Sequence, residues 1–207
     1  DLEACAEKDD DRRKALIVNC LPLNEGERRA FAKAARDVPQ EFVGDEAHRG
    51  DMVWSAAVPE ELRSRATAVI GNFPVSQASQ YTRLEWLQTF SAGVDAYICP
   101  GVLPRGTMVT NASGAYGQSV SEHMFATMWA LMKNLNRYAS NQRDHQWQDE
   151  GPVLSPEGGI ALIIGVGDIG SHFAQLAQSV GMRTFGVRRH ADVPAKGIEK
   201  MYGFERL

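Results

Sequence analysis

A glycine-rich segment that directly follows an apolar run is the feature that most constrains how this chain of 207 residues folds. The run Ile160–Ile164 leads into the segment 165–170, Gly-Val-Gly-Asp-Ile-Gly, and apolar residues then recur at helical spacing as far as Val180. This order predicts a buried strand, a tight turn and a helix that ends at Gly181. The pattern Gly-x-Gly-x-x-Gly between a strand and a helix indicates a dinucleotide-binding unit.

Each glycine of this motif has a physical reason. Gly165 permits the tight turn, Gly167 lets the backbone approach a pyrophosphate, and Gly170 lets the helix pack close to the strand. The free N–H groups at the start of the helix, together with its positive end, favour an anion. The residues expected to bind the cofactor are therefore Gly165, Gly167, Asp168, Ile169 and Gly170. The alternative is a glycine-rich turn that binds no ligand.

Two arginines follow the second predicted strand of this unit. The strand spans residues 183–187, and Arg188 and Arg189 come directly after it. An NAD-binding unit usually has Asp or Glu at this strand end, where the carboxylate accepts hydrogen bonds from the ribose 2′-OH. Guanidinium groups instead favour the 2′-phosphate of NADP(H). We therefore expect NADP(H) to be preferred to NAD(H), with a solvated basic turn as the alternative.

The preceding part of the chain alternates short apolar runs with helical segments. Asn24 and Glu27 resemble a capping box, and apolar residues at helical spacing follow them. Strands that alternate with helices favour a mostly parallel sheet covered by helices. The predicted strands span residues 15–18, 41–43, 68–71, 85–90 and 108–110, and a further helix opens at Pro59.

The sequence thus predicts the α/β class, with two Rossmann or flavodoxin-like parallel-sheet domains of which the second is incomplete. Residues 1–13 are expected to be a disordered leader, because they are highly charged and lack an apolar period. Residues 14–112 are expected to form the first domain and residues 113–207 a truncated dinucleotide-binding domain. Neither Gly nor Pro interrupts residues 118–137, so we expect one long helix with a stripe of Met and Leu.

Composition and charge exclude several classes of function. The chain has 22 Lys and Arg against 26 Asp and Glu, a formal net charge of −4, and neither sign forms a long block. A nucleic-acid partner would favour a basic stripe, so none is expected. No apolar run approaches the ~18 residues of a membrane span. Cys5, Cys20 and Cys99 form neither a Cys-x-x-Cys pair nor a disulfide framework, which favours a cytoplasmic location and no metal site.

Four motifs together resemble the D-isomer-specific 2-hydroxyacid dehydrogenase family. They are residues 87–95 (LQTFSAGVD), 111–117 (NASGAYG), 120–123 (VSEH) and 165–170 (GVGDIG). The resemblance covers roughly residues 15 to 207, and four motifs in one order are more specific than the glycine motif alone.

This resemblance implies a two-domain oxidoreductase with its active site between a substrate domain and an NAD(P)-binding domain. It implies hydride transfer between NAD(P)H and a 2-oxo acid, which yields a D-2-hydroxy acid. The backbone amides of Ser91, Ala92 and Gly93 would hold the substrate carboxylate, which agrees with a loop of small residues that exposes N–H donors. Tyr116 is a further candidate for lining the substrate site, with a packing role as the alternative.

The resemblance also implies that the family's catalytic Arg, Glu and His would lie beyond Leu207. No catalytic residue is therefore assigned, and the 207-residue chain is expected to be catalytically incomplete. None of the five histidines occupies the position of the family's acid/base residue, and surface, capping or packing roles are expected for all of them. They are His48, His123, His145, His172 and His190.

The long predicted helix is expected to mediate a homodimer through the nucleotide-binding domain, because an exposed apolar face would otherwise promote aggregation. Three other interpretations remain at this point. The chain could be a dinucleotide-sensing module of the corepressor type, in which cofactor binding promotes dimerisation. It could be an inert truncated product, or a methyltransferase with a glycine-rich loop.

Overall fold

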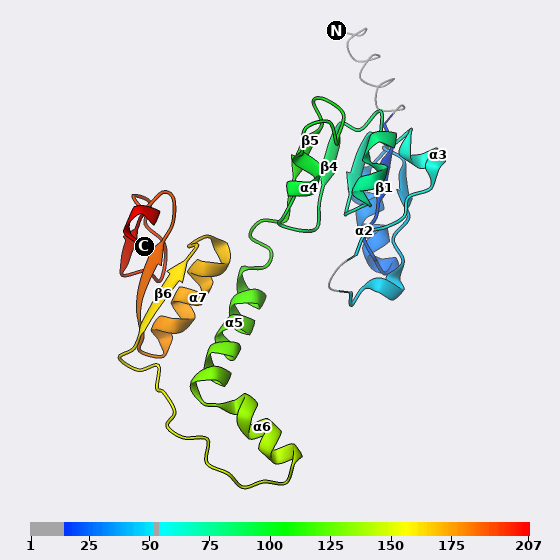
Figure 1. The fold of residues 1–207 in the computed structure, drawn as a ribbon. Coiled ribbons are helices and arrows are strands. Elements are labelled where there is room, and N and C mark those ends of the chain that lie inside the picture. Colours follow the sequence, from blue (N-terminus) through cyan, green and yellow to red (C-terminus); the bar gives the residue numbers. More distant parts are fainter. Residues whose placement is uncertain (1–14, 52–53) are drawn as a thin grey trace. The chain divides into compact units, whose positions relative to one another are not determined.

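The computed structural model describes residues 15–51 and 54–207 and divides the chain into two units, Asp1–Ala112 and Ser113–Leu207 (Figure 1). We call these unit 1 and unit 2 and describe each by itself. The expected leader, residues 1–13, lies outside the described residues.

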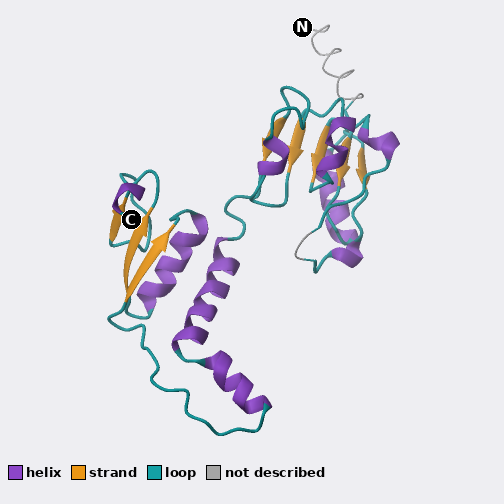
Figure 2. Cartoon of the chain, in the orientation of Figure 1, coloured by secondary structure: helices purple, strands orange, loops and turns teal. Residues whose placement is uncertain are grey.

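Unit 1 is built on a parallel sheet of five strands in the order β2-β1-β3-β4-β5 (Figure 2). This is the flavodoxin-like order, in which ligands bind beyond the carboxyl ends of the strands. The strands are β1 (Ile17–Asn19), β2 (Gln40–Phe42), β3 (Ala68–Ile70), β4 (Trp86–Gln88) and β5 (Met108–Thr110). The helices are α2 (Glu25–Ala35), α3 (Glu60–Arg63) and α4 (Asp95–Ile98), with 3₁₀ turns η1 (Glu46–His48) and η2 (Val75–Gln80).

The capping box predicted at the start of α2 is confirmed. The Glu27 N–H donates to the Asn24 side-chain oxygen at 2.9 Å, and the Asn24 N–H donates to the Glu27 carboxylate at 3.0 Å. Arg49, just after η1, donates to the same carboxylate, with Nη2 lying 2.6 Å from Oε1. These hydrogen bonds lower the pKa of Glu27 from 4.5 to about 2.

Unit 2 contains a parallel sheet of three strands in the order β6-β7-β8. The strands are β6 (Ile160–Ile164), β7 (Arg183–Val187) and β8 (Lys200–Tyr202). The helices are α5 (Gly117–Met132), α6 (Leu135–Arg143) and α7 (Asp168–Ser179), followed by the 3₁₀ turn η3 (Phe204–Arg206). The two parallel sheets confirm the predicted α/β class, and β6, α7 and β7 form the predicted strand, helix and strand around the glycine motif.

The prediction of a single long helix over residues 118–137 is wrong. The structure has α5 and α6 instead, separated by Lys133 and Asn134. Asn134 has φ 53° and ψ 29°, the left-handed conformation that Asn tolerates better than most residues. Its side-chain amide donates to the carbonyl of Glu150 at 3.3 Å, so a contact with a distant segment accompanies the break.

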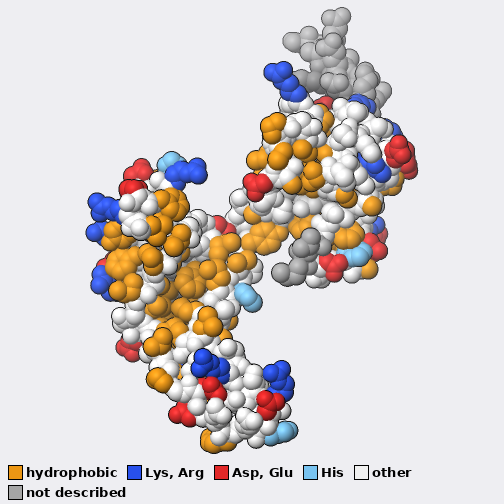
Figure 3. Space-filling model, viewed as in Figure 1, with side chains coloured by type: hydrophobic (Ala, Val, Ile, Leu, Met, Phe, Trp, Pro, Cys, Tyr) orange, Lys and Arg blue, Asp and Glu red, His pale blue; other side chains and the backbone are white. Residues whose placement is uncertain are grey.

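Apolar side chains remain exposed on unit 2, and Figure 3 shows hydrophobic side chains gathered along α5. On β6, Ile160, Leu162 and Ile164 are each more than half exposed, whereas Ile163 packs into the core of the unit. The helices contribute Met124, Leu131 and Leu135, which are also exposed. Exposed apolar surface of this kind is typical of a face that binds another protein surface.

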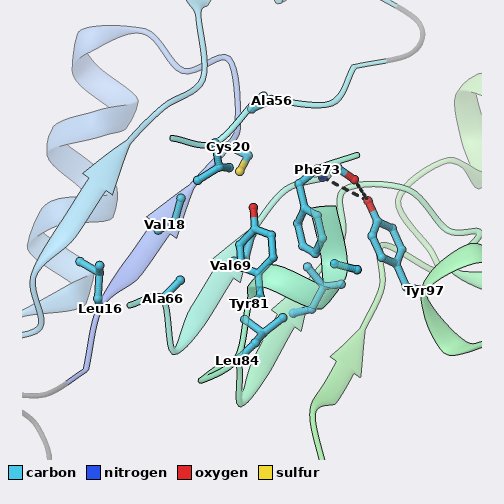
Figure 4. Close-up of a cluster of buried hydrophobic side chains, with 13 residues drawn as sticks. Leu16, Val18, Cys20, Ala56, Ala66, Val69, Phe73, Tyr81, Leu84 and Tyr97 are labelled. Atoms are coloured by element: carbon cyan, nitrogen blue, oxygen red, sulfur yellow. Dashed lines mark hydrogen bonds between the residues drawn. The ribbon is translucent and has the colours of Figure 1, made fainter. Parts of the chain in front are cut away.

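The core of unit 1 joins the segments that follow β3 and β4 (Figure 4). The Tyr97 hydroxyl, on α4, donates to the Phe73 carbonyl at 2.5 Å and accepts from the Phe73 N–H at 3.1 Å. The Phe73 ring stacks on Tyr81, with ring centroids 4.2 Å apart. Burial raises the pKa of the Tyr97 hydroxyl, so it stays protonated and keeps donating. The loop after β3 is thereby fastened to the helix after β4.

Candidate functional site

The three glycines of the motif in unit 2 differ in what their backbone does: Gly165 turns the chain, Gly167 faces free space, and Gly170 lets α7 lie close to β6. Gly165 has φ +94°, a conformation that favours glycine. A Cβ at Gly170 would lie 2.4 Å from the carbonyl oxygen of Gly165, so α7 can approach β6 only because this residue has no side chain. A Cβ at Gly167 would meet no atom of the described residues within 4 Å. The surroundings of Gly167 therefore leave room for a ligand against the backbone.

The start of α7 is open to an anion. Gly167 is the residue before the first turn, and none of the described side chains caps the helix. The Ser171 hydroxyl donates to the Gly167 carbonyl at 2.6 Å, and the His172 ring nitrogen Nδ1 lies 3.0 Å from the Asp168 carbonyl. These side chains therefore contact carbonyl groups and leave the first-turn N–H groups without a side-chain acceptor, as an anion site requires.

An open pocket of about 500 Å³ lies between α7 and the segment that follows β7. Arg188 and Lys196 bring positive charge to it, and Asp168 is the carboxylate on its wall. The lining residues are Val166, Gly167, Asp168, Ser171, His172, Gln175, Arg188, Pro194, Ala195 and Lys196. Sequence reasoning missed Lys196, because nothing in the pattern distinguishes this lysine from a solvated loop residue.

The two arginines after β7 lie in different surroundings. The guanidinium of Arg188 donates from Nε to the His190 carbonyl at 2.9 Å, from Nη1 to the Val166 carbonyl at 3.2 Å, and from Nη2 to the Val193 carbonyl. Arg188 thus ties the segment after β7 to the glycine turn. Arg189 is exposed and is not among the residues that line the pocket.

The loop over Ser91, Ala92 and Gly93 lies beyond the carboxyl end of β4 in unit 1, and each of its carbonyls is bonded back into the unit. The carbonyl of Ser91 accepts from the Thr89 hydroxyl at 2.8 Å, and that of Ala92 accepts from the Asn111 side-chain amide at 2.7 Å. The carbonyl of Gly93 accepts from the Ser91 hydroxyl at 2.8 Å. Within the described residues, the N–H groups of Ser91, Ala92 and Gly93 bond to no backbone carbonyl. Such a loop offers donors to an anion.

Two other candidate residues, Tyr116 and His48, belong to neither the glycine motif nor the loop Ser91–Gly93. Tyr116 is the half-buried residue before α5 in unit 2, so its role beside the loop of unit 1 stays a prediction. His48 lies 2.7 Å from the Asp51 carboxylate and stacks on Trp54. No cluster of metal-ligating side chains occurs in residues 15–51 and 54–207, and no helix described there is long and apolar enough to cross a bilayer.

Comparisons with known proteins agree with this geometry. Residues 125–207 match the family profile described as D-isomer specific 2-hydroxyacid dehydrogenase, NAD binding domain. The chain is 30% identical over 105 residues to the D-3-phosphoglycerate dehydrogenase of Bacillus subtilis, which is 50% of this chain and 20% of that protein. It is 24% identical over 135 residues to the glycerate dehydrogenase of Methylorubrum extorquens, 61% of this chain and 43% of that protein.

A solved structure of a D-isomer specific 2-hydroxyacid dehydrogenase family protein from Aeromonas salmonicida shares the fold. Its TM-score is 0.74 at 23% identity, and the match covers 93% of this chain and 59% of that one. The parallel sheets and the glycine motif define a dinucleotide-binding α/β protein. Residues 125–207 are thus similar to the NAD-binding domain of the D-isomer specific 2-hydroxyacid dehydrogenase family, and the matches span less than half of the two curated relatives described above.

Proposed function

We propose that this chain provides the dinucleotide site and the substrate-carboxylate site of an NAD(P)H-dependent oxidoreductase that interconverts 2-oxo acids and D-2-hydroxy acids. The observation that carries the proposal is the open space at Gly167 beside the uncapped start of α7. The pyrophosphate fits there, because backbone N–H groups and the positive helix end face it. Gly165, Asp168, Ile169 and Gly170 complete this loop. When bound, NAD(P)H supplies the hydride.

The loop Ser91–Gly93 supports the substrate half of the proposal. Its carbonyls are occupied by hydrogen bonds within unit 1, so its N–H groups are the polar atoms that remain for a ligand. A carboxylate is the group that all 2-oxo and 2-hydroxy acids share, and it accepts from several N–H donors at once. These donors would hold the acid by its carboxylate, and Tyr116 is proposed as a further substrate-binding residue.

The cofactor preference proposed is for NADP(H). A guanidinium has five N–H groups, and Arg188 uses three of them on carbonyls, which leaves two for a 2′-phosphate. Exposed Arg189 and the pocket residue Lys196 add positive charge around the same segment. NAD(H) lacks the 2′-phosphate and would gain less from these charges.

We also propose that two copies pair through unit 2. Met124, Leu131, Met132 and Phe173 line an apolar groove on this unit, and α6 adds exposed Leu135. A second copy would cover this face with an identical one, as two-fold symmetric interfaces do. A cytoplasmic location is proposed as well, since Cys20 and Cys99 are free thiols.

Chemical-shift mapping of the ¹⁵N-labelled chain tests the two sites separately. NADPH should shift the amide signals of residues 165–170, and pyruvate should shift those of residues 91–93. Shifts confined to other regions would contradict the proposal. Sedimentation in the same samples addresses the corepressor-type alternative, which requires dimers to form only when a dinucleotide is present.

A further inference from the structure

A side-chain amide from the neighbouring strand end fastens the loop Ser91–Gly93. Asn72 follows β3, and its Oδ1 accepts from the Phe90 N–H at 3.2 Å while its Nδ2 donates to the Ser91 hydroxyl oxygen at 3.2 Å. Because a backbone N–H only donates, the Phe90 contact fixes which end of the amide is the oxygen. The amide is therefore oriented, with its NH₂ group toward Ser91.

The oriented Asn72 amide in turn orients the Ser91 hydroxyl, which bonds to the far end of the loop. The hydroxyl oxygen accepts from Asn72, so its own proton is free to donate to the Gly93 carbonyl, 2.8 Å away. A peptide group is planar and trans, so a carbonyl held against the protein points the N–H of the following residue away from it. The relay from Asn72 thus sets the direction of the Val94 N–H.

Asn72 is itself held firmly. Its backbone carbonyl accepts from the Ala56 N–H at 3.0 Å, and the next residue, Phe73, is bonded through both backbone groups to the Tyr97 hydroxyl. The Asn72 side chain is half-buried, so water competes less for its hydrogen bonds than at an exposed site. Because these bonds fix Asn72, its side-chain amide holds the loop in one conformation instead of adjusting to the loop.

We propose that Asn72 is the positioning residue of the carboxylate loop: through Phe90 and Ser91 it presents the loop N–H groups to an anion. This inference rests on the proposed substrate-carboxylate site, and it adds a residue that does not touch the acid. The ligand class is a 2-oxo acid, recognised by its carboxylate.

The variant Asn72→Asp tests the inference, because its pyruvate affinity should depend on whether the introduced carboxyl group is ionised. When ionised, the introduced carboxylate accepts from the Phe90 N–H but does not donate to Ser91, and its charge repels a carboxylate ligand. When protonated, the introduced carboxyl group restores the donor and acceptor of the amide. Pyruvate is still mostly ionised at pH 3.5, whereas an Asp with its ordinary pKa of about 3.9 is mostly protonated there, so pyruvate remains a suitable probe. We expect pyruvate affinity, followed by the amide shifts of residues 91–94, to fall about tenfold relative to the wild type at pH 7.5 and to recover toward it at pH 3.5.

The matched control is Gln80→Glu, an amide-to-carboxylate change at an exposed residue of the same unit, which should bind pyruvate as the wild type does at both pH values. Equal affinity of Asn72→Asp and wild type at pH 7.5, or a loss that does not depend on pH, would overturn the inference. Failure of the wild type to bind pyruvate would overturn it together with the proposed carboxylate site, and NADPH binding by unit 2 would show that the dinucleotide site stands.

A second measurement does not depend on the Asn72→Asp variant folding. If Asn72 acts on Gly93 through Ser91, the double variant Asn72→Ala/Ser91→Ala should bind pyruvate no more weakly than Asn72→Ala alone. Additive losses from the two single changes would show that Asn72 does not act through the Ser91 hydroxyl, and would overturn the relay.

Discussion

The carbonyl oxygen of Gly165 lies 2.4 Å from the position that a Cβ would occupy on Gly170. The obstacle is backbone rather than the end of a flexible side chain, so Gly170→Ala must push α7 away from β6. We expect this change to lower the free energy of unfolding of unit 2 by about 1–3 kcal/mol, as overpacking does. Thermal or urea unfolding measures it. Gly167→Ala is the control, since its Cβ enters open space at φ −104°, and an equal loss in the two variants would contradict the packing argument.

Substitutions of the two arginines after β7 should have different effects on cofactor binding. Arg189→Asp should reduce the preference for NADPH over NADH by about 10- to 100-fold, because it replaces an attraction to the 2′-phosphate with a repulsion. Arg188→Asp should weaken the binding of both cofactors, because it also breaks the bonds to Val166, His190 and Val193. Titration of each variant with both cofactors measures these effects. Equal affinity of the unmodified chain for NADPH and NADH would refute the assignment.

Acid should weaken unit 1 through Glu27. Its folded pKa of about 2 lies below its ordinary value of 4.5, so its contribution to stability is present above about pH 4.5 and is lost as the pH falls toward 2. Glu27→Gln keeps an acceptor for the capping box but carries no charge toward Arg49. The difference in stability between wild type and Glu27→Gln should therefore shrink between pH 5 and pH 2 in denaturant titrations. A difference that stays constant over this range would contradict the role of the carboxylate.

The exposed face of α5 should mediate pairing. Leu131 is 65% exposed in the single chain, and a carboxylate at this position would be buried without a partner in a symmetric dimer. We predict that Leu131→Glu yields a monomer in sedimentation velocity at micromolar concentration, with an unchanged melting temperature for unit 1. A wild-type chain that is already monomeric at that concentration would contradict the proposed interface.

The glycine motif could be predicted from the sequence because its determinants are local. Gly165, Gly167 and Gly170 lie within one strand, turn and helix, and the apolar spacing around them fixes the type of each element. The capping box of α2 was predictable for the same reason, since its two partners are three residues apart.

Long-range contacts could not be predicted from spacing alone. Asn72 bonds to Phe90 and Ser91, which lie 18 and 19 positions further along the chain. At the break between α5 and α6, Asn134 bonds to Glu150, which lies 16 positions away. Such contacts depend on how strands and segments meet, and no periodic pattern records them. Lys196 belongs to the same group, because the path of the segment after β7 brings it to the pocket.

Calorimetric titration with NADPH of the wild-type chain and of Gly167→Val tests whether the pyrophosphate of a dinucleotide lies against Gly167. In the free protein a Cβ at residue 167 meets no described atom within 4 Å, whereas a side chain at this position occupies the space that a pyrophosphate needs against this backbone. We expect saturable binding by the wild type, a loss of affinity of more than about tenfold in the variant, and the same unfolding temperature for both free proteins. Wild-type and Gly167→Val chains that bind NADPH equally well, or a wild-type chain that binds none, would contradict this expectation.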